Sequence, residues 1–161
     1  MIYQSTSDLD EICSYHCVGT DASYKGNHIA SAAIIVITQG QLVYQNAWPC
    51  LAHSSFDGEL QALLDAVKYI ASHLEGLVIV ISDNEAAIAA ACNNSPHSGF
   101  ASSLAICKLL LKWFQCSPRN QLQFRWFPGH EGLDINALAD LLAGQELPCI
   151  NPPIVATTAS R

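Results

Sequence analysis

Four acidic residues stand at places in the chain where a fold could bring their carboxylates together. Asp21 lies in the first apolar segment, Glu59 near the start of a long helical stripe, Asp83 directly after "LVIVIS", and Asp140 in the last helical segment. Carboxylates gathered at one edge of a sheet repel each other unless cations neutralise them, and hard cations such as Mg²⁺ prefer oxygen ligands. Two such ions about 3.5–4 Å apart assist in-line attack at a phosphodiester. The residue types therefore favour metal-assisted hydrolysis.

Each acid also has a structural interpretation when it is taken alone. Asp83 precedes a helical pattern and would serve as its N-cap, and Glu59 near a helix start would favour the helix dipole. Asp21 in "TDAS" resembles a turn former, and Asp140 could be a solvated helix residue. Only the order and context of all four favour a shared site.

The apolar periodicity predicts the elements that must position these acids. Strands are expected at 15–23, 28–38, 41–48, 77–82 and 122–127, and helices at 56–74, 84–92, 100–116 and 136–144. A turn-like "YKGN" joins the first two strands. The order βββαβααβα, a meander followed by crossover helices, predicts an α/β fold with a mixed five-stranded sheet and helices packed on it. Strand ends and helix starts in such sheets converge on one edge.

The 161 residues are most simply one domain at 13–146, with linkers at 1–12 and 147–161 in a piece of a longer protein. Seven Lys and Arg against 14 Asp and Glu leave a formal charge of −7. Because phosphate affinity normally comes from Lys and Arg, a nucleic-acid role would need metal ions or basic surface from a neighbouring domain. Seven cysteines without a C-x-x-C pattern or a secretory signal indicate a reducing compartment.

Four blocks of the sequence carry a family resemblance: "GTDASYKGN", "GELQALLDAV", "VIVISDNEAA" and "FRWFPGHEGLDINALAD". Together they resemble the signature blocks of the ribonuclease H family over about residues 15–144. The last block is the most specific, because a tryptophan strand, Pro-Gly-His, a short loop, Asn and Ala-Asp are similar to the ribonuclease H domains of non-LTR retroelement reverse transcriptases.

The resemblance implies a ribonuclease H-like fold and cleavage of the RNA strand of an RNA–DNA hybrid by two-metal hydrolysis. Asp21, Glu59, Asp83 and Asp140 would hold two Mg²⁺ ions, for which Mn²⁺ can substitute, and His130 would assist proton transfer or product departure. The hybrid and a fused or associated reverse transcriptase polymerase are the expected partners, in the cytoplasm or nucleus, with no membrane.

Three further residues are candidate substrate contacts. Ser23 and Asn84 stand beside two of the acids, where contact with the hybrid and plain turn or cap roles are equally good interpretations. Asn136 matches the asparagine that opens the family's last helix. It would organise the His130 loop, and N-capping accounts for it equally well.

The chain also departs from the family pattern. The family's cellular members often grip the hybrid with a basic, tryptophan-bearing protrusion, whereas "NNSPHSGFASS" contains no Lys or Arg. Phe56 and Asp57 replace polar hybrid-contacting residues, and Ile135 and Ala137 stand where Gly and Glu are frequent. The missing grip leaves open a catalytically weak or inactive module that binds or scaffolds hybrids, and a DNA-cleaving nuclease of the same fold is a further alternative. The intact acids favour activity.

Aromatic residues near the ends of two predicted elements could form a base-stacking platform. Their spacing favours packing into the core instead, and this prediction covers Trp113, Phe114, Phe124 and Trp126.

Overall fold

The computed structural model describes residues 15–93, 95–128 and 134–145. His130 and the predicted linkers at 1–12 and 147–161 lie outside these residues. Within them, no helix is both long enough and apolar enough to cross a membrane.

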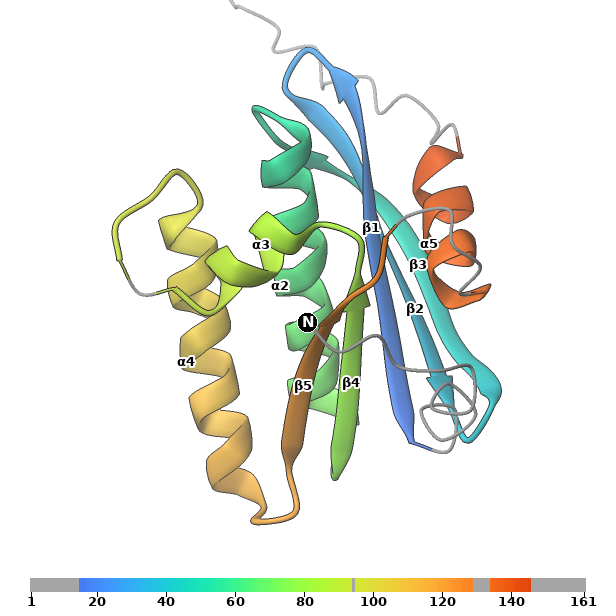
Figure 1. Cartoon of the computed structure of the whole chain (residues 1–161), viewed down its shortest axis with the longest axis vertical. Helices are drawn as coiled ribbons and strands as arrows, with labels where there is room; N and C mark the ends of the chain where they lie inside the picture. Colours follow the sequence, from blue (N-terminus) through green and yellow to red (C-terminus); the bar gives the residue numbers. More distant parts are fainter. Residues whose placement is uncertain (1–14, 94, 129–133, 146–161) are drawn as a thin grey trace, which may run out of the picture.

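The predicted α/β fold and the element order βββαβααβα are confirmed (Figure 1). A five-stranded mixed sheet runs in the order β3-β2-β1-β4-β5. The first three strands form an antiparallel meander, β4 pairs in parallel with β1, and β5 pairs in parallel with β4. The elements are β1 (His16–Gly26), β2 (Ile29–Thr38), β3 (Gln41–Leu51), α2 (Ser55–His73), β4 (Leu77–Ser82), α3 (Glu85–Ala91), α4 (Phe100–Cys116), β5 (Gln121–Trp126) and α5 (Asp134–Gly144).

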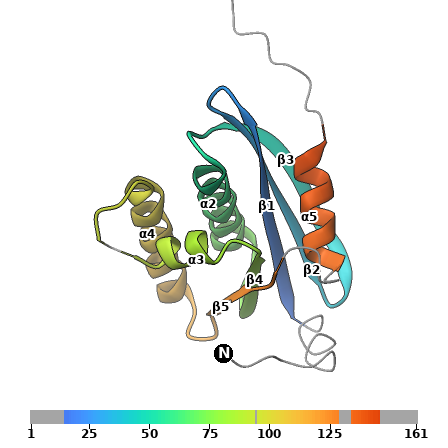
Figure 2. The ribbon, with the colours of Figure 1, turned by 45° about the horizontal axis from the view of Figure 1, so that its top comes forward.

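The helices cover the two faces of the sheet unequally, with α2, α3 and α4 on one face and α5 on the other (Figure 2). The alternation of side chains along each strand divides the core accordingly. Val18 and Val80 pack with the three-helix face, whereas Cys17 and Ile81 pack with Ile135 of α5. Because both faces are covered, β4 reads as an uninterrupted apolar run.

Two strands are longer than their sequence patterns predict. β1 continues through the predicted turn to Gly26, so the turn itself contains Asn27 and His28, with φ of 50° and 62°. β3 continues past Trp48 through Pro49 to Leu51. Proline is tolerated there because β3 is an edge strand, where an N–H is not needed for a second neighbour.

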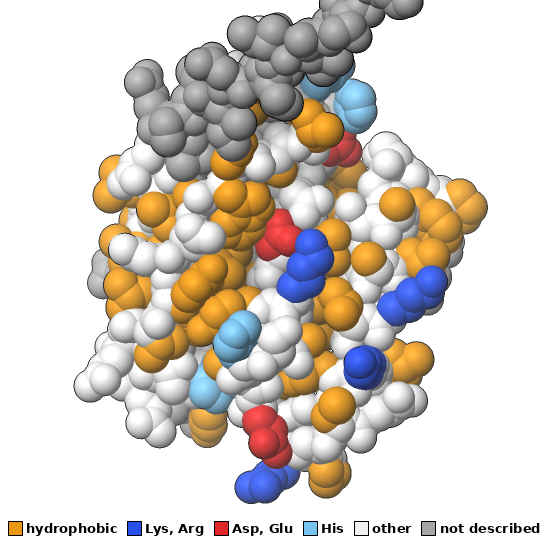
Figure 3. Space-filling model, turned by 180° about the vertical axis from the view of Figure 1, so that it is seen from behind, with side chains coloured by type: hydrophobic (Ala, Val, Ile, Leu, Met, Phe, Trp, Pro, Cys, Tyr) orange, Lys and Arg blue, Asp and Glu red, His pale blue; other side chains and the backbone are white. Residues whose placement is uncertain are grey.

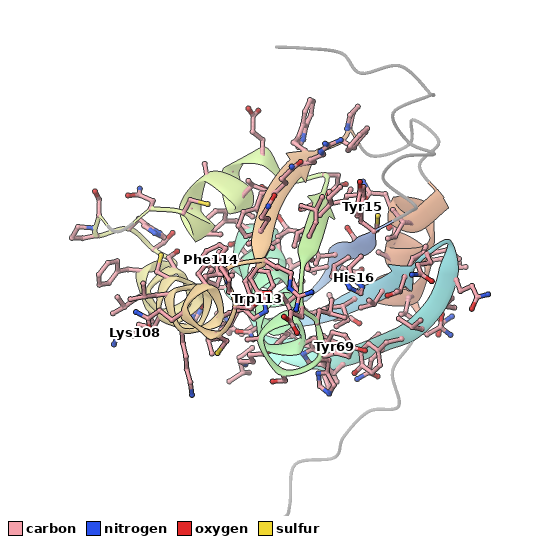
Figure 4. The ribbon with its side chains drawn as sticks, turned by 90° about the horizontal axis from the view of Figure 1, so that it is seen from below. Tyr15, His16, Tyr69, Lys108, Trp113 and Phe114 are labelled. Atoms are coloured by element: carbon pink, nitrogen blue, oxygen red, sulfur yellow. The ribbon has the colours of Figure 1, made fainter. Side chains whose placement is uncertain are left out.

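The prediction that the four aromatic residues lie in the core is only partly right. Trp113 is 3% exposed, and its indole Nε1 donates to the carbonyl of Leu74 at 2.9 Å. It lies between α4 and the end of α2 (Figure 4). Phe124 is half-buried against the same core. Phe114 and Trp126 are 42% and 41% exposed, so the prediction is wrong for these two.

Gly19 allows α5 to lie close against β1. A Cβ at this position would approach Cγ1 of Ile135 to 2.7 Å and the Ile135 carbonyl oxygen to 3.1 Å. Ile135, a departure from the family pattern, is therefore accommodated by a glycine on the facing strand. Lys25 also ties the β1–β2 hairpin to α5, since its Nζ donates to the Gly144 carbonyl at 3.3 Å. These contacts fix the helix that carries Asp140.

We expect Gly19→Val to lower the free energy of unfolding by about 1–3 kcal/mol, because the added atoms overpack the β1–α5 contact. Ile135→Ala alone should also destabilise by leaving a cavity. The double variant should lose less stability than the sum of the two single changes, as urea unfolding would measure. Strictly additive losses would show that the two residues do not share a contact.

Candidate active site

Three of the four predicted acids meet at one edge of the sheet. Asp21, Glu59 and Asp83 each offer a carboxylate oxygen, and these oxygens all lie within 4.8 Å of one another. Asp21 and Glu59 are buried, at 8% and 5% exposure, whereas Asp83 is exposed. The cluster therefore has two buried carboxylates, Asp21 and Glu59, and one that faces solvent, Asp83.

The parallel pairing of β1 with β4 places two of these acids side by side. Gly19 pairs with Ile81 at the end of the ladder. Asp21 is two residues beyond Gly19 on β1, and Asp83 is two residues beyond Ile81, directly after β4 ends at Ser82, so the parallel register places both acids at the same end of the two strands. The backbone register thus brings together acids that are far apart in the sequence.

Glu59 reaches the cluster from α2 because the helix packs closely on the sheet. A Cβ at the preceding Gly58 would meet the Cβ atoms of Ala22 and Ala30 at 3.1 and 3.0 Å. Glu59 Oε1 accepts the Ala22 N–H at 3.1 Å, while Oε2 is buried with no hydrogen-bond partner among the described residues. Since α2 begins at Ser55 and Glu59 is buried, the helix-dipole interpretation of Glu59 is wrong.

The first turn of α2 is stabilised by other residues. Ser54 is the N-cap and accepts the Asp57 N–H at 3.2 Å. The Asp57 carboxylate in turn accepts the His53 N–H at 3.0 Å. Together these bonds satisfy backbone donors at the helix start, as in a capping box. Asp57 stands where family members often have residues that contact the hybrid, and in this chain it stabilises the start of α2.

Asp83 is not the cap of α3, so its predicted capping role is wrong. Asn84 is the N-cap, and its Oδ1 accepts the Ala87 N–H at 2.9 Å. The Asn84 N–H donates to Ser82 Oγ at 3.2 Å, which fixes the turn between β4 and α3. Of the two interpretations of Asn84, the cap role is confirmed. The Asp83 side chain belongs to the acid cluster instead.

Asp140 lies on α5, in an exposed position close enough to act on the buried acids. Its charge raises the pKa of both Asp21 and Glu59. It stands outside the group of three whose oxygens lie within 4.8 Å. The structure thus brings three predicted acids into contact range and places the fourth within their electrostatic field.

The electrostatic cost of the cluster appears in its pKa values. Burial, followed by the charges of Asp83 and Asp140, raises the pKa of Asp21 to about 7. Burial, then Asp21 and Asp83, raises the pKa of Glu59 to about 9, although the bond from Ala22 opposes the shift. An all-oxygen donor set that resists ionisation by itself, with one buried oxygen lacking a protein partner, fits hard divalent cations.

Comparison with known protein families agrees with the resemblance seen in the sequence. The family model described as RNase H matches residues 14–147, which is well over half of the chain. The chain belongs to the ribonuclease H family. A comparison with curated proteins found no match. Members of this family typically use divalent metals, and the acidic group of Asp21, Glu59 and Asp83 could hold one in this ribonuclease H domain.

Trp126 of this ribonuclease H domain contacts the site in a way that the sequence pattern did not reveal. Its indole Nε1 donates to the main-chain carbonyl of Asp83 at 2.8 Å. Trp126 pairs with Ser82 in the parallel β4–β5 ladder, and the Phe127 N–H donates to the Ser82 carbonyl at 3.1 Å. The end of β5 thus fixes the backbone that carries Asp83. The signal was the position of Trp126 at the end of the strand that neighbours β4.

The remaining candidate residues have different outcomes. Ser23 lies two residues after Asp21 on β1, so both side chains belong to one face of the strand.

Asn136 is the third residue of α5, and its N-capping interpretation is wrong because the helix begins at Asp134. Both polar atoms of the Asn136 amide are buried without a partner among the described residues. Its role near His130, which lies outside those residues, stays a prediction.

The raised pKa values of Asp21 and Glu59 predict that metal-free protein loses stability as the pH rises. Both groups bind protons more tightly in the folded state, so the stability contributed by their neutral forms is lost between about pH 4 and pH 9. Thermal melting in a chelator should show a falling melting temperature across this range, and Mg²⁺ should restore it mainly at the alkaline end.

Glu59→Gln should flatten this pH dependence and abolish most of the stabilisation by Mg²⁺, because it removes the charge that burial disfavours most. Glu85→Gln, at an exposed position in the first turn of α3, is the matched control and should keep the wild-type slope. If the pH dependence of the melting temperature is unchanged in Glu59→Gln, the buried Glu59 carboxyl is not its source.

Trp126→Phe should weaken Mg²⁺ or Mn²⁺ binding about 2- to 10-fold, because it removes the N–H that holds the Asp83 backbone and keeps an aromatic ring. Calorimetric metal titration would measure the loss. Trp48→Phe is the matched control, since its indole donates to Asp65 Oδ2 at 3.1 Å in a different network. The control should lose stability without losing metal affinity. Equal metal affinities in Trp126→Phe and wild type would exclude the positioning role.

Proposed function

We propose that this ribonuclease H domain hydrolyses the RNA strand of RNA–DNA hybrids with the help of two divalent cations, Mg²⁺ or Mn²⁺. The observation that carries the proposal is the convergence of Asp21, Glu59 and Asp83 within 4.8 Å, on the fold of a hydrolase family. Asp140 is the fourth acid of the proposed site, because its charge raises the pKa of both Asp21 and Glu59.

The four acids would hold the cations, with Asp21 and Glu59 at the buried side and Asp83 and Asp140 at the exposed side. When bound, the cations supply Lewis-acid chemistry that favours an attacking hydroxide and offsets charge on the leaving 3′ oxygen, giving 5′-phosphate products. The chain itself contributes a fixed frame: Ala22 orients the Glu59 carboxylate, and Trp126 orients the Asp83 backbone. Such pre-organisation avoids rearrangement during the reaction.

Residues around the acids would contact the hybrid and handle protons. Ser23, which shares a strand face with Asp21, is suited to contact the nucleic acid, and Asn84 could do so with the part of its amide that does not cap α3. His130 would assist proton transfer or product departure, and Asn136 would organise the loop that carries it. The 2′-hydroxyl is the group by which such contacts distinguish RNA from DNA.

The charge distribution supports a role within a larger protein. The chain carries a net charge of −7, and the basic side chains visible on the face shown in Figure 3 do not gather into one patch. Because phosphate affinity comes largely from Lys and Arg, we propose that a reverse transcriptase polymerase of a non-LTR retroelement supplies the grip on the hybrid. Such a protein would act in the cytoplasm or nucleus.

The same charge also favours a second candidate function, a catalytically weak module that binds or scaffolds hybrids. The two functions differ in metal binding. A scaffold would bind Mn²⁺ no better than a generic acidic surface, whereas the proposed enzyme should lose Mn²⁺ affinity on Asp21→Asn.

Asp83→Asn should reduce cleavage of a labelled RNA–DNA hybrid by about 10²–10⁴-fold, because it removes several kcal/mol of charge stabilisation at the metal site. Gel analysis of RNA fragments at low salt and high Mn²⁺ would measure the rate, with Glu85→Gln as the active control. A DNA duplex of the same sequence should stay intact. If wild type and Asp83→Asn are equally inert, also with the polymerase present, the proposed activity is wrong.

A further inference from the structure

A pair of histidines lies outside the acid cluster, at the start of β2 and α2. His28 is in the β1–β2 turn and His53 is in the segment before α2, and both are exposed. Their Nδ1 atoms are 3.0 Å apart, and the rings meet edge to face with centroids 4.9 Å apart. We propose that His28 and His53 form a binding site for a divalent transition-metal ion, distinct from the carboxylate site.

The main chains of both histidines are fixed by hydrogen bonds. The His28 carbonyl accepts the Ala52 N–H at 3.0 Å, next to the last pair of the β2–β3 ladder, Ile29 with Leu51. The His53 N–H donates to Asp57 Oδ2, also at 3.0 Å. The two rings are therefore brought together by the sheet and by the helix cap, so that little additional ordering is needed for both to bind one ion.

The separation of the two Nδ1 atoms suits chelation. Imidazole nitrogens bind Zn²⁺ at about 2.0–2.1 Å, so a spacing of 3.0 Å corresponds to an angle of about 95° at the metal. Neighbouring positions of square or octahedral sites have this angle, and a tetrahedral site needs an opening of only about 0.3 Å. Without metal, one neutral ring donates its Nδ1–H to the Nδ1 of the other. To bind the ion, the donor ring would change to its Nε2–H tautomer, so that the lone pairs of both Nδ1 atoms are free for the metal.

The donor type selects a different class of cation from the acid cluster. Imidazole suits Zn²⁺, Cu²⁺ and Ni²⁺, whereas Mg²⁺ prefers oxygen. Among the described residues, the only group of three or more His, Cys, Asp or Glu ligands that converge is the acid cluster. The histidine pair would therefore supply two ligands and leave the other positions to water. Asp57 adds a nearby negative charge that offsets the cation.

An ion at this site would join two segments that are distant in the sequence. It would connect the β1–β2 turn to the segment that enters α2, six residues before Glu59. Because such an ion binds the folded chain and not separate unfolded segments, it would stabilise the fold in proportion to its affinity. The site therefore predicts metal-dependent stability even when the acid cluster is saturated with Mg²⁺.

Zinc titration of the protein in excess Mg²⁺ tests the proposal. Calorimetry should detect one Zn²⁺ equivalent, with affinity reduced about tenfold or more in His28→Ala and in His53→Ala. His73→Ala, which changes an exposed histidine stacked on Tyr69, is the matched control and should bind Zn²⁺ like wild type. Asp83→Asn should also retain this Zn²⁺ binding, so failure of the proposed hydrolysis would leave this result intact.

A second measurement covers the case in which a variant is unstable. Electron paramagnetic resonance of the Cu²⁺-loaded wild-type protein should show coupling to two imidazole nitrogens. Zinc binding that persists unchanged in both alanine variants would overturn the proposal. So would a Cu²⁺ spectrum without nitrogen coupling, or the absence of any Zn²⁺ binding in excess Mg²⁺.

Discussion

The mutual repulsion of carboxylates that are partly removed from water is the constraint on which the site depends. Asp21 and Glu59 would each be easier to bury as neutral acids, and their raised pKa values reflect that preference. The fold nevertheless holds them against Asp83 through the β1–β4 register and the close approach of α2 at Gly58. Rigid backbone contacts thus maintain an arrangement that the side chains alone would not adopt, and bound cations would relieve its electrostatic cost.

Residues next to the acids, and not the acids themselves, cap the helices and fix the turn. Ser54 and Asp57 stabilise the start of α2, and Asn84 caps α3. Trp126 anchors the Asp83 backbone from the adjacent strand. Because these residues satisfy the helix starts and the turn, the carboxylates of Glu59 and Asp83 can serve the cluster. The same division explains why an acid beside a helix start need not be a cap.

Periodicity was sufficient to predict the order of elements and the fold, since an apolar run such as "LVIVIS" and the stripe of α2 each admit few alternatives. The acids were found through the order of their motifs. Two errors concern contacts between elements, namely the burial of Glu59 and the exposed indole of Trp126. The third is a local shift of one residue, since Asn84 caps α3 in place of Asp83. His28 and His53 meet only because β2 pairs with β3, so no local pattern could reveal their contact.

The two cation sites would differ by donor type. Carboxylates attract hard and borderline ions alike, so excess Mg²⁺ is needed to keep Zn²⁺ from the acid cluster, whereas Mg²⁺ has little affinity for paired imidazoles. In a chain with 14 acidic and seven basic residues, bound cations would offset part of the net negative charge. Its attraction to a polyanion should therefore depend on which cations are present as well as on salt concentration. Metal supply would thus influence both the chemistry of the acids and the approach of the nucleic acid.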